Sequence, residues 1–410
     1  MVNKNLRIFF FIAVLILLNP WNVCGQTDFS DINLAMRYRP NSNVPIAYQI
    51  TKKDSLFIIF FSVEISKNVG FNDNFSIIYE IKSDYNVNNS LVSRTLTSYL
   101  HGIGEDDEKK YFRFEINGQA DNNILFLRLK NTLSDIVYIK DIPLKETMTY
   151  PAPDFYISKS NSDIPILDSF INFDDSIQIQ GPGSNDQIFY IYHYDHIFSA
   201  ADPPMYRIDK DVSKALDVDL ELQVRSGEPF VLQKKGLYFI QSDTTSSSGI
   251  SIRSEEKFFP KLTTMKNIID PVIYLTTRQE IDKLKDNENQ KEAFERFWLK
   301  LASSEDQAGR LIRKYFDQVE IVNELFTNYK PGWKTDMGMI YIIFGPPDEA
   351  YSNGETESWY YKTQSSTIVF NFLRLKSIFT HNHYVLIRDR QYKNAWFKAI
   401  DNWRRGIINR

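Results

Sequence analysis

The sequence of 410 residues contains a single cysteine, Cys24. One thiol cannot form an intrachain disulfide, so the folded chain has to be stabilised by burial of its apolar side chains. The sequence also lacks the HExxH, GxSxG, GxxxxGK and GxGxxG patterns that mark common zinc, nucleophile, phosphate and dinucleotide sites. Without such a motif, we predict that the chain has no catalytic residues, binds no cofactor and holds no metal.

An excess of positive charge is also missing. The chain has 48 Lys and Arg against 52 Asp and Glu, which gives a formal net charge of −4 at pH 7. A mildly acidic protein with interspersed charges has no electrostatic basis for binding nucleic acid. Aromatic residues are abundant, with 30 Phe and 23 Tyr, and this composition favours β-sheet. The length suggests two or three domains.

The N-terminus has the features of a secretory signal. Lys4 and Arg7 precede an apolar run over residues 8–18, which is shorter than the about 20 residues that a membrane span needs. We expect cleavage before Gln26. The alternatives are that Cys24 is lipidated, which would attach the protein to a membrane, or that the segment stays as an uncleaved anchor. We therefore expect an exported protein that is periplasmic, outer-membrane associated or secreted.

Short β segments separated by polar turns follow the signal of residues 1–25. Residues 26–145 show seven or eight such segments, counting the weaker ones, and this spacing predicts an immunoglobulin-like β-sandwich. Closely spaced prolines then mark a linker, and residues 154–260 predict a second β-sandwich. The strongest predicted strands are 55–61, 75–81, 111–116, 124–129, 136–139, 176–180, 187–193, 219–224, 236–241 and 250–253.

Residues 262–410 change to a helical period and predict an α+β domain. Thr277 and Glu280 form a capping-box pattern that opens a helix, and Ser304 opens a longer one. A final helix places Trp396, Phe397, Ile400 and Trp403 on one face. We expect these helices to pack on an antiparallel meander of strands 339–344, 357–362, 367–373 and 384–388. The predicted fold class is therefore multidomain, with two all-β sandwiches followed by an α+β domain.

The stretch KPGWKTDMGMIYIIFGPPDE, residues 330–349, is the most distinctive part of the chain. Its run Met339–Phe344 is continuously apolar and rich in β-branched side chains, which favours a strand buried on both faces. A Pro-Pro pair has no amide donors, so no ladder continues past it. The motif residues that we select are Gly332, Trp333, Thr335, Asp336, Gly338, Gly345, Pro346, Pro347 and Asp348.

The pentapeptide from Gly332 to Asp336, followed by GMIYIIFGPPDE, resembles the signature of the GWxTD-domain family of Bacteroidetes-type exported proteins, which has no assigned reaction. The resemblance covers about residues 262–410. It implies an exported protein with β-domains ahead of the signature domain. Met337 departs from the pattern, because a basic residue is expected after Asp336. If relatives bind a ligand with that charge, this chain lacks it.

A structural role for the motif is the simplest interpretation. Trp333 is expected to fill the helical layer, Thr335 and Asp336 to cap the local turn, and Gly338 to supply a positive φ. Alternatively, Asp336 could join Asp348 and Glu349 in an acidic cluster. A six-residue strand would separate these ends by about 20 Å, which is too far for paired carboxylates.

Four of the five histidines fall in two short clusters, at His193 with His196 and at His381 with His383. A pair spaced by two on a strand projects to one face, which is compatible with a metal, but no third ligand is identifiable. We expect these histidines to lie in exposed loops.

We therefore predict a non-catalytic structural or interaction protein of the bacterial cell envelope, whose GWxTD domain docks a partner that is an envelope protein or a glycan. Two alternatives stay open. One is a hydrolase of an envelope or extracellular polymer that uses Asp336, Asp348 or His383. The other is a glycan-binding protein that uses exposed aromatic rings such as Tyr351 or Tyr360.

Overall fold

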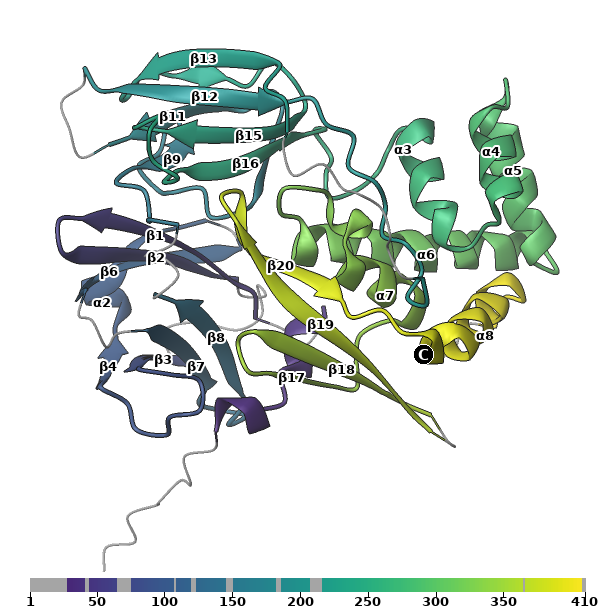
Figure 1. Ribbon diagram of the computed structural model, residues 1–410, viewed down its shortest axis with the longest axis horizontal. Coiled ribbons are helices and arrows are strands. Elements are labelled where there is room, and N and C mark those ends of the chain that lie inside the picture. Colours follow the sequence, from purple (N-terminus) through teal and green to yellow (C-terminus); the bar gives the residue numbers. More distant parts are fainter. Residues whose placement is uncertain are drawn as a thin grey trace, which may run out of the picture.

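The computed structural model shows two β-sandwiches and a C-terminal region in which helices pack on a further sheet (Figure 1). The predicted fold class is thus confirmed. The predicted signal segment with Cys24 lies outside the described residues. None of the helices in the described part of the chain has the length and apolar character needed to cross a membrane. The structure describes residues 28–40, 44–64, 75–106, 108–118, 123–144, 150–181, 186–206, 216–363 and 366–407.

The first sandwich packs two four-stranded antiparallel sheets face to face. Their orders are β1-β2-β6-β5 and β4-β3-β7-β8. Inward side chains of both sheets form the core, in which the rings of Phe61 and Phe112 stack with centroids 4.8 Å apart. The elements are β1 (Ile46–Lys53), β2 (Leu56–Glu64), β3 (Phe75–Lys82), β4 (Val92–Leu96), α2 (Ser98–His101), β5 (Gly102–Glu105), β6 (Lys109–Asn117), β7 (Ile124–Asn131) and β8 (Val137–Pro143).

The second sandwich packs a five-stranded sheet of order β10-β16-β15-β12-β13 on a three-stranded sheet of order β14-β11-β9. The pairing of β10 with β16 is parallel, and the other pairs are antiparallel. Fully buried side chains such as Ile177, Phe189 and Tyr238 fill the space between the sheets. The elements are β9 (Tyr156–Lys159), β10 (Phe170–Asn172), β11 (Ser176–Gln180), β12 (Ile188–Tyr194), β13 (Leu220–Arg225), β14 (Phe230–Val231), β15 (Gly236–Gln241) and β16 (Ile250–Glu255).

The C-terminal region packs α7 onto an antiparallel meander of order β17-β18-β19-β20, with α6 against the other side of α7. In Figure 1 the meander lies between the first sandwich and the helices. The helices are α3 (Met265–Ile269), α4 (Arg278–Lys285), α5 (Gln290–Leu301), α6 (Glu305–Phe326), α7 (Asp336–Phe344) and α8 (Lys393–Arg404), with the 3₁₀ turns η4 (Asp270–Tyr274), η5 (Gly332–Lys334) and η6 (Arg390–Tyr392). The strands are β17 (Glu349–Ser352), β18 (Thr356–Lys362), β19 (Thr367–Ser377) and β20 (Thr380–Leu386).

The predicted helix starts are confirmed. Thr277 and Glu280 form a reciprocal capping box at α4, and the hydroxyl of Ser304 caps α6. The predicted buried face of α8 is only partly right. Trp403 is buried, but Phe397 is 50% exposed.

The prediction of a strand at Met339–Phe344 is wrong, because these residues belong to helix α7. All of the residues from Asp336 to Ile343 are buried, so the run is apolar on every side of the helix. A helix buried all round shows neither the period of a strand nor that of an amphipathic helix, and an apolar run alone does not distinguish them. Thr335 caps the start of α7, and Gly345, with φ of 78°, ends it. The first strand of the meander is instead β17.

The first described residues, in η1 (Phe29–Asp31) and η2 (Ala35–Tyr38), pack between the first sandwich and the meander. The ring of Phe29 contacts that of Phe126 on β7, with centroids 4.9 Å apart. Tyr341 on α7 donates a hydrogen bond to the carbonyl of Tyr38 at 2.8 Å. One hydrophobic core therefore includes both the start and the end of the described chain.

Candidate functional site

The motif forms a sharp corner between α6 and α7. Its first three residues make the 3₁₀ turn η5, and Thr335 is the N-cap of α7. The Thr335 hydroxyl donates to the carbonyl of Gly332 at 2.7 Å and accepts from the amide of Gly338 at 3.0 Å. One side chain therefore fixes both the end of the turn and the start of the helix. Gly338 lies within α7, so the positive φ predicted for it is wrong.

The corner lies directly on α6. A Cβ atom on Gly332 would sit 1.8 Å from the carbonyl oxygen of Val322, so no larger residue fits there. The Gly332 amide donates to the hydroxyl of Thr327 at 2.9 Å, and the Trp333 amide donates to Oδ1 of Asn323 at 3.1 Å. Both of these partners belong to the end of α6 or the residue after it, and they hold the turn in register with that helix.

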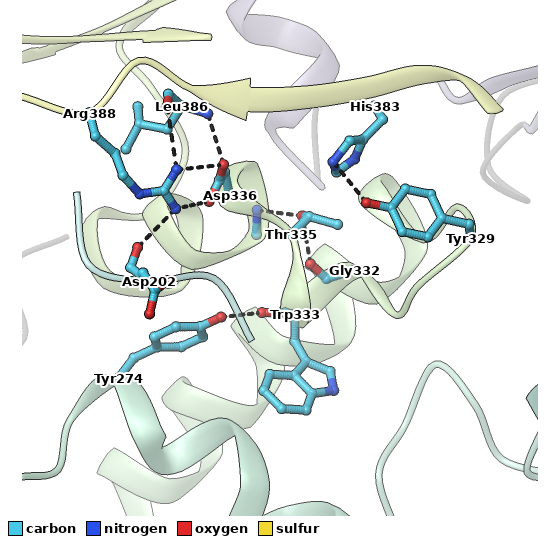
Figure 2. Close-up of polar contacts among 11 residues, drawn as sticks. Asp202, Tyr274, Tyr329, Gly332, Trp333, Thr335, Asp336, His383, Leu386 and Arg388 are labelled. Atoms are coloured by element: carbon cyan, nitrogen blue, oxygen red, sulfur yellow. Dashed lines mark hydrogen bonds and ion pairs between the residues drawn. The ribbon is translucent and has the colours of Figure 1, made fainter. Parts of the chain in front are cut away.

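The indole of Trp333 lies in the helical layer and is 6% exposed. Tyr274 in η4 contacts it edge-on, with ring centroids 6.4 Å apart. The Tyr274 hydroxyl also donates to the carbonyl of Trp333 at 2.8 Å, as Figure 2 shows. Both the side chain and the backbone carbonyl of Trp333 therefore contact buried residues of the same chain.

Asp336 is buried and bound on both carboxylate oxygens (Figure 2). Arg388 approaches with Nη2 at 2.5 Å from Oδ1 and Nη1 at 3.2 Å from Oδ2. The amide of Leu386 donates to Oδ2 at 2.9 Å. The side chains of Asp336 and Arg388 are 8% and 6% exposed. This carboxylate joins the start of α7 to the end of β20.

Arg388 was not selected from the sequence, and no local pattern identifies it. Its position after β20 brings it to Asp336 only when the meander is folded. Arg388 Nη2 also donates to the carbonyl of Asp202, in the segment that follows β12, at 3.1 Å. The buried pair therefore connects the corner to the chain that leaves the second sandwich.

The far end of α7 carries the other predicted motif residues. Gly345 and Pro347 are buried, and Tyr361 donates to the carbonyl of Gly345 at 2.9 Å. The adjacent Pro346 lies in the same connection to β17. Asp348 Oδ2 accepts from the amide of Lys362 at 2.6 Å. A nine-residue helix is about 14 Å long, so the Asp336 and Asp348 carboxylates lie at opposite ends of α7 and are bound separately.

The prediction of exposed loops is wrong for three of the four histidines, because His193 and His383 are buried in strands and His381 is a half-buried residue of β20. His193 is a buried residue of β12, with Nδ1 2.5 Å from Asp219 and Nε2 3.0 Å from the carbonyl of Lys235. His383 is a buried residue of β20 whose Nε2 lies 3.1 Å from the hydroxyl of Tyr329. Burial lowers the pKa of His383 from 6.5 to about 4. Both ring nitrogens of His193 already have protein partners, which leaves it no nitrogen for proton transfer to a substrate.

Neither a metal site nor a flat row of rings is found in this region. Within the described ranges, no three His, Cys, Asp or Glu side chains come together as metal ligands. The rings of Tyr351 and Tyr360 are 5.6 Å apart but meet at 85°. An edge-on pair does not offer the flat platform on which a sugar ring stacks.

Fold and corner together define a multidomain β-sandwich protein that ends in an α+β domain. Residues 236–405 match the family model of the GWxTD domain, so the chain carries a GWxTD domain, as its motif predicts. The match begins at the first residue of β15, ahead of the predicted start at residue 262. It therefore includes the last two strands of the second sandwich.

Two solved structures are similar to parts of the chain. The three N-terminal domains of the bacteriophage RB49 outer capsid protein Hoc are 9% identical, and the likeness covers 52% of this chain and 58% of that one, with a TM-score of 0.15. The major pilin subunit BcpA of Bacillus cereus is 10% identical, with 48% and 58% covered and a TM-score of 0.15. The chain thus spans less than two thirds of either structure, and TM-scores this low carry no argument about function. A search of curated proteins found no match.

Proposed function

We propose that the protein is an exported, non-catalytic structural or interaction protein of the cell envelope, in which the GWxTD domain docks a partner. The single observation that supports this most is the engagement of the motif itself. Its hydroxyl, its carboxylate and the carbonyl of Trp333 are all bonded to groups of the same chain. A motif whose polar groups already bind other groups of the chain fits a structural role as an internal brace better than a catalytic role.

Further bonds near the corner tie the helical C-terminal region to the second sandwich. Ser169 donates to the carbonyl of Thr327 at 2.7 Å, and Arg253 donates to the carbonyl of Tyr329 at 2.8 Å. The contact of Arg388 with the carbonyl of Asp202 makes a third connection. Such bonds keep neighbouring domains in a fixed orientation, as a spacer or docking module requires.

The outer face of the meander is the surface that we assign to the partner. On β19, Leu373 and Leu375 are 42% and 45% exposed, and Ile387 beside them is 49% exposed. Phe370 and Phe372 alternate with them and are buried against the helices. Exposed apolar side chains gathered on one sheet face are typical of protein contact sites.

Charge placed on this face tests the proposal. We expect the double variant Leu373→Glu/Ile387→Glu to lose its specific partners in crosslinking pull-downs from the source cells, while its melting temperature stays that of the wild type. Leu133→Glu is the matched control, because Leu133 is 76% exposed in a turn of the first sandwich. A partner set that the double variant shares with the wild type would refute docking at this face. Recovery of the wild type only in the cytoplasm on fractionation would refute export.

A further inference from the structure

Strand β13 forms one edge of the five-stranded sheet of the second sandwich. In Figure 1 it lies at the top of the view, on the side of this sandwich that is away from the first sandwich and the helices. It pairs with β12 on one side, and no other described strand pairs with it on the other side, which we call the open edge. An open edge can pair with a strand of another molecule, so proteins usually cover or block such edges.

The backbone of β13 presents hydrogen-bonding groups at the open edge. The amide of Ser226, directly after the strand, donates to the carbonyl of Gln187 at 2.9 Å and continues the antiparallel ladder with β12. The residues directed at a partner strand alternate along such a ladder, so the backbone groups of Leu222 and Val224 also face β12. The backbone groups of the remaining residues point outward, and these are Glu221, Gln223 and Arg225.

Little in the structure blocks this edge. Strand β13 contains neither a proline nor a register shift. On the edge strand β8, by contrast, Arg37 donates to the carbonyl of Ile139 from Nε at 3.1 Å and from Nη2 at 2.8 Å. At the open edge of β13 the carbonyl of Arg225 accepts from the amide of Glu228 at 3.2 Å, and a carbonyl can accept a second bond. The side chains of these two residues are 3.8 Å apart and 61% and 59% exposed, so their ion pair is weak.

The side chains of β13 alternate between the two faces of the sheet. Leu222 and Val224 pack on the core of the sandwich, and Glu221, Gln223 and Arg225 are exposed on the outer face. When two copies of β13 run antiparallel with Gln223 opposite Gln223, each Glu221 faces Arg225 of the second copy, and each Leu222 faces Val224. The three residues whose backbone groups point outward also lie opposite one another. The strand is therefore complementary to itself in charge, in apolar character and in backbone hydrogen bonding.

Other registers match less well. A shift by two residues in one direction places Arg225 opposite Asp219, whose carboxylate already accepts from Lys234 at 2.7 Å. The same shift in the other direction places Glu221 opposite Gly227, which has no charge to pair with it. Charge pairing thus favours the register centred on the middle of the strand.

We propose that the protein forms a twofold-symmetric dimer in which the open edges of two β13 strands pair antiparallel about Gln223. The five-stranded sheets of the two copies then join into one continuous sheet. A strand of six residues spans only about 20 Å, so we expect a transient dimer with a dissociation constant in the micromolar range. The open edge is separate from the outer face of the meander, so failure of the dimer would leave the docking proposal intact.

Sedimentation velocity of the full chain across micromolar concentrations tests for the dimer. We expect the sedimentation coefficient to rise with concentration from the value of a monomer to that of a dimer. Hydrogen exchange locates the contact, because the amide of Gln223 points outward and should exchange more slowly as the concentration rises. The amides of β4, an edge strand of the first sandwich, should exchange at a constant rate. A monomer at every concentration would overturn the proposal and would leave the open edge to a strand of a different protein.

Charge reversal tests the register. Glu221→Arg and Arg225→Glu should each weaken association at least about tenfold, because like charges then face each other in both of the symmetry-related pairs. The double variant Glu221→Arg/Arg225→Glu restores opposite charges and should associate within about twofold of the wild type. Lys53→Glu, which reverses an exposed charge on the edge strand β1, is the matched control and should associate like the wild type. A double variant that stays as weak as the single variants, or an equal loss in the control, would overturn the proposal.

Gln223→Pro tests the backbone hydrogen bonds. The amide of Gln223 points away from β12, so the monomer loses no ladder bond and should melt within a few degrees of the wild type. The dimer loses its central donor on both copies, and association should fall at least about tenfold. Association as tight as that of the wild type would place the contact elsewhere and overturn the proposal.

Discussion

The buried pair of Asp336 and Arg388 gives the sharpest test of the corner as a brace. Asp336→Asn keeps the shape of the side chain and removes its charge. The guanidinium of Arg388 then stays buried, at 6% exposure, without a carboxylate. Removing one partner of a buried ion pair typically costs about 3–5 kcal/mol, because the remaining charge is uncompensated. We therefore expect the free energy of unfolding of the GWxTD domain to fall by about that amount.

A double-mutant cycle separates this effect from general damage to the site. Arg388→Met alone leaves the Asp336 carboxylate with the amide of Leu386 and the N-terminus of α7, so its cost should be smaller. The double variant Asp336→Asn/Arg388→Met should lose less stability than the sum of the two single variants, by about 2 kcal/mol or more.

Urea unfolding followed by tryptophan fluorescence suits this cycle. The described tryptophans all lie in the GWxTD domain and are buried, so their emission reports on that domain: Trp298, Trp333, Trp359, Trp396 and Trp403. The transition that they report should be analysed by itself, because a multidomain chain can unfold in several steps.

The exposed pair of Arg278 and Asp282, with side chains 91% and 52% exposed, is the control. The same cycle there should give a coupling below about 1 kcal/mol. A coupling at Asp336 and Arg388 as small as that of the control would refute the brace.

Three further predictions use stability as the measurement. Gly332→Ala should lower the free energy of unfolding by more than about 3 kcal/mol or prevent folding, since the added methyl would lie 1.8 Å from a backbone oxygen. Gly309→Ala is the control, because its added methyl has no neighbour nearer than 3.7 Å, and thermal melts should show a stabilisation of up to about 1 kcal/mol. Burial lowers the pKa of Lys140 on β8 from 10.5 to about 8, so between these pH values the folded chain binds fewer protons than the unfolded chain. The free energy of unfolding of the wild type, measured by urea titration relative to that of Lys140→Met, should therefore rise across pH 8–10.5 by at most about 3 kcal/mol. The hydrogen bond from Arg404 lowers the pKa of Glu280 from 4.5 to about 2, so the stabilisation by ionised Glu280 is complete above about pH 4.5 and is lost as the pH falls towards 2. In Glu280→Gln the urea midpoint should depend less on pH in that window, and an unchanged pH dependence would contradict the assignment.

The sandwiches were predictable because their strands alternate or cluster their apolar residues locally. Predicted strands 176–180 and 236–241 coincide with β11 and β15. The strands that were missed include β10 and β14, which have three and two residues. Segments this short show no period of their own, and the neighbouring strands define them.

The helix α7 and the buried histidines were misread for a related reason. Periodicity reports how one side of an element differs from the other, and α7 is surrounded by protein on all sides. The sequence around His193 resembles a polar turn, yet the residue points into the sandwich because Asp219 and the carbonyl of Lys235 satisfy its ring. Partners 26 and 42 residues away leave no local trace.

Within the candidate site, the residues of the pentapeptide were identifiable by their unusual spacing, and the partners that bind them were not. Arg388 lies 52 residues after Asp336 and is brought there by the meander.

The packing of η2 against α7 and β18 has a consequence for how the chain matures. Tyr38 is bonded to Tyr341, at a sequence separation of 303 residues, and Leu34 donates its amide to the carbonyl of Ala350 at 2.7 Å. Residues 28–40 therefore keep their apolar side chains uncovered until the residues around Tyr341 and Ala350 have been synthesised. Contacts of such range slow folding, so a chaperone that shields residues 28–40 during synthesis should raise the yield of native protein more than one that acts on the finished chain.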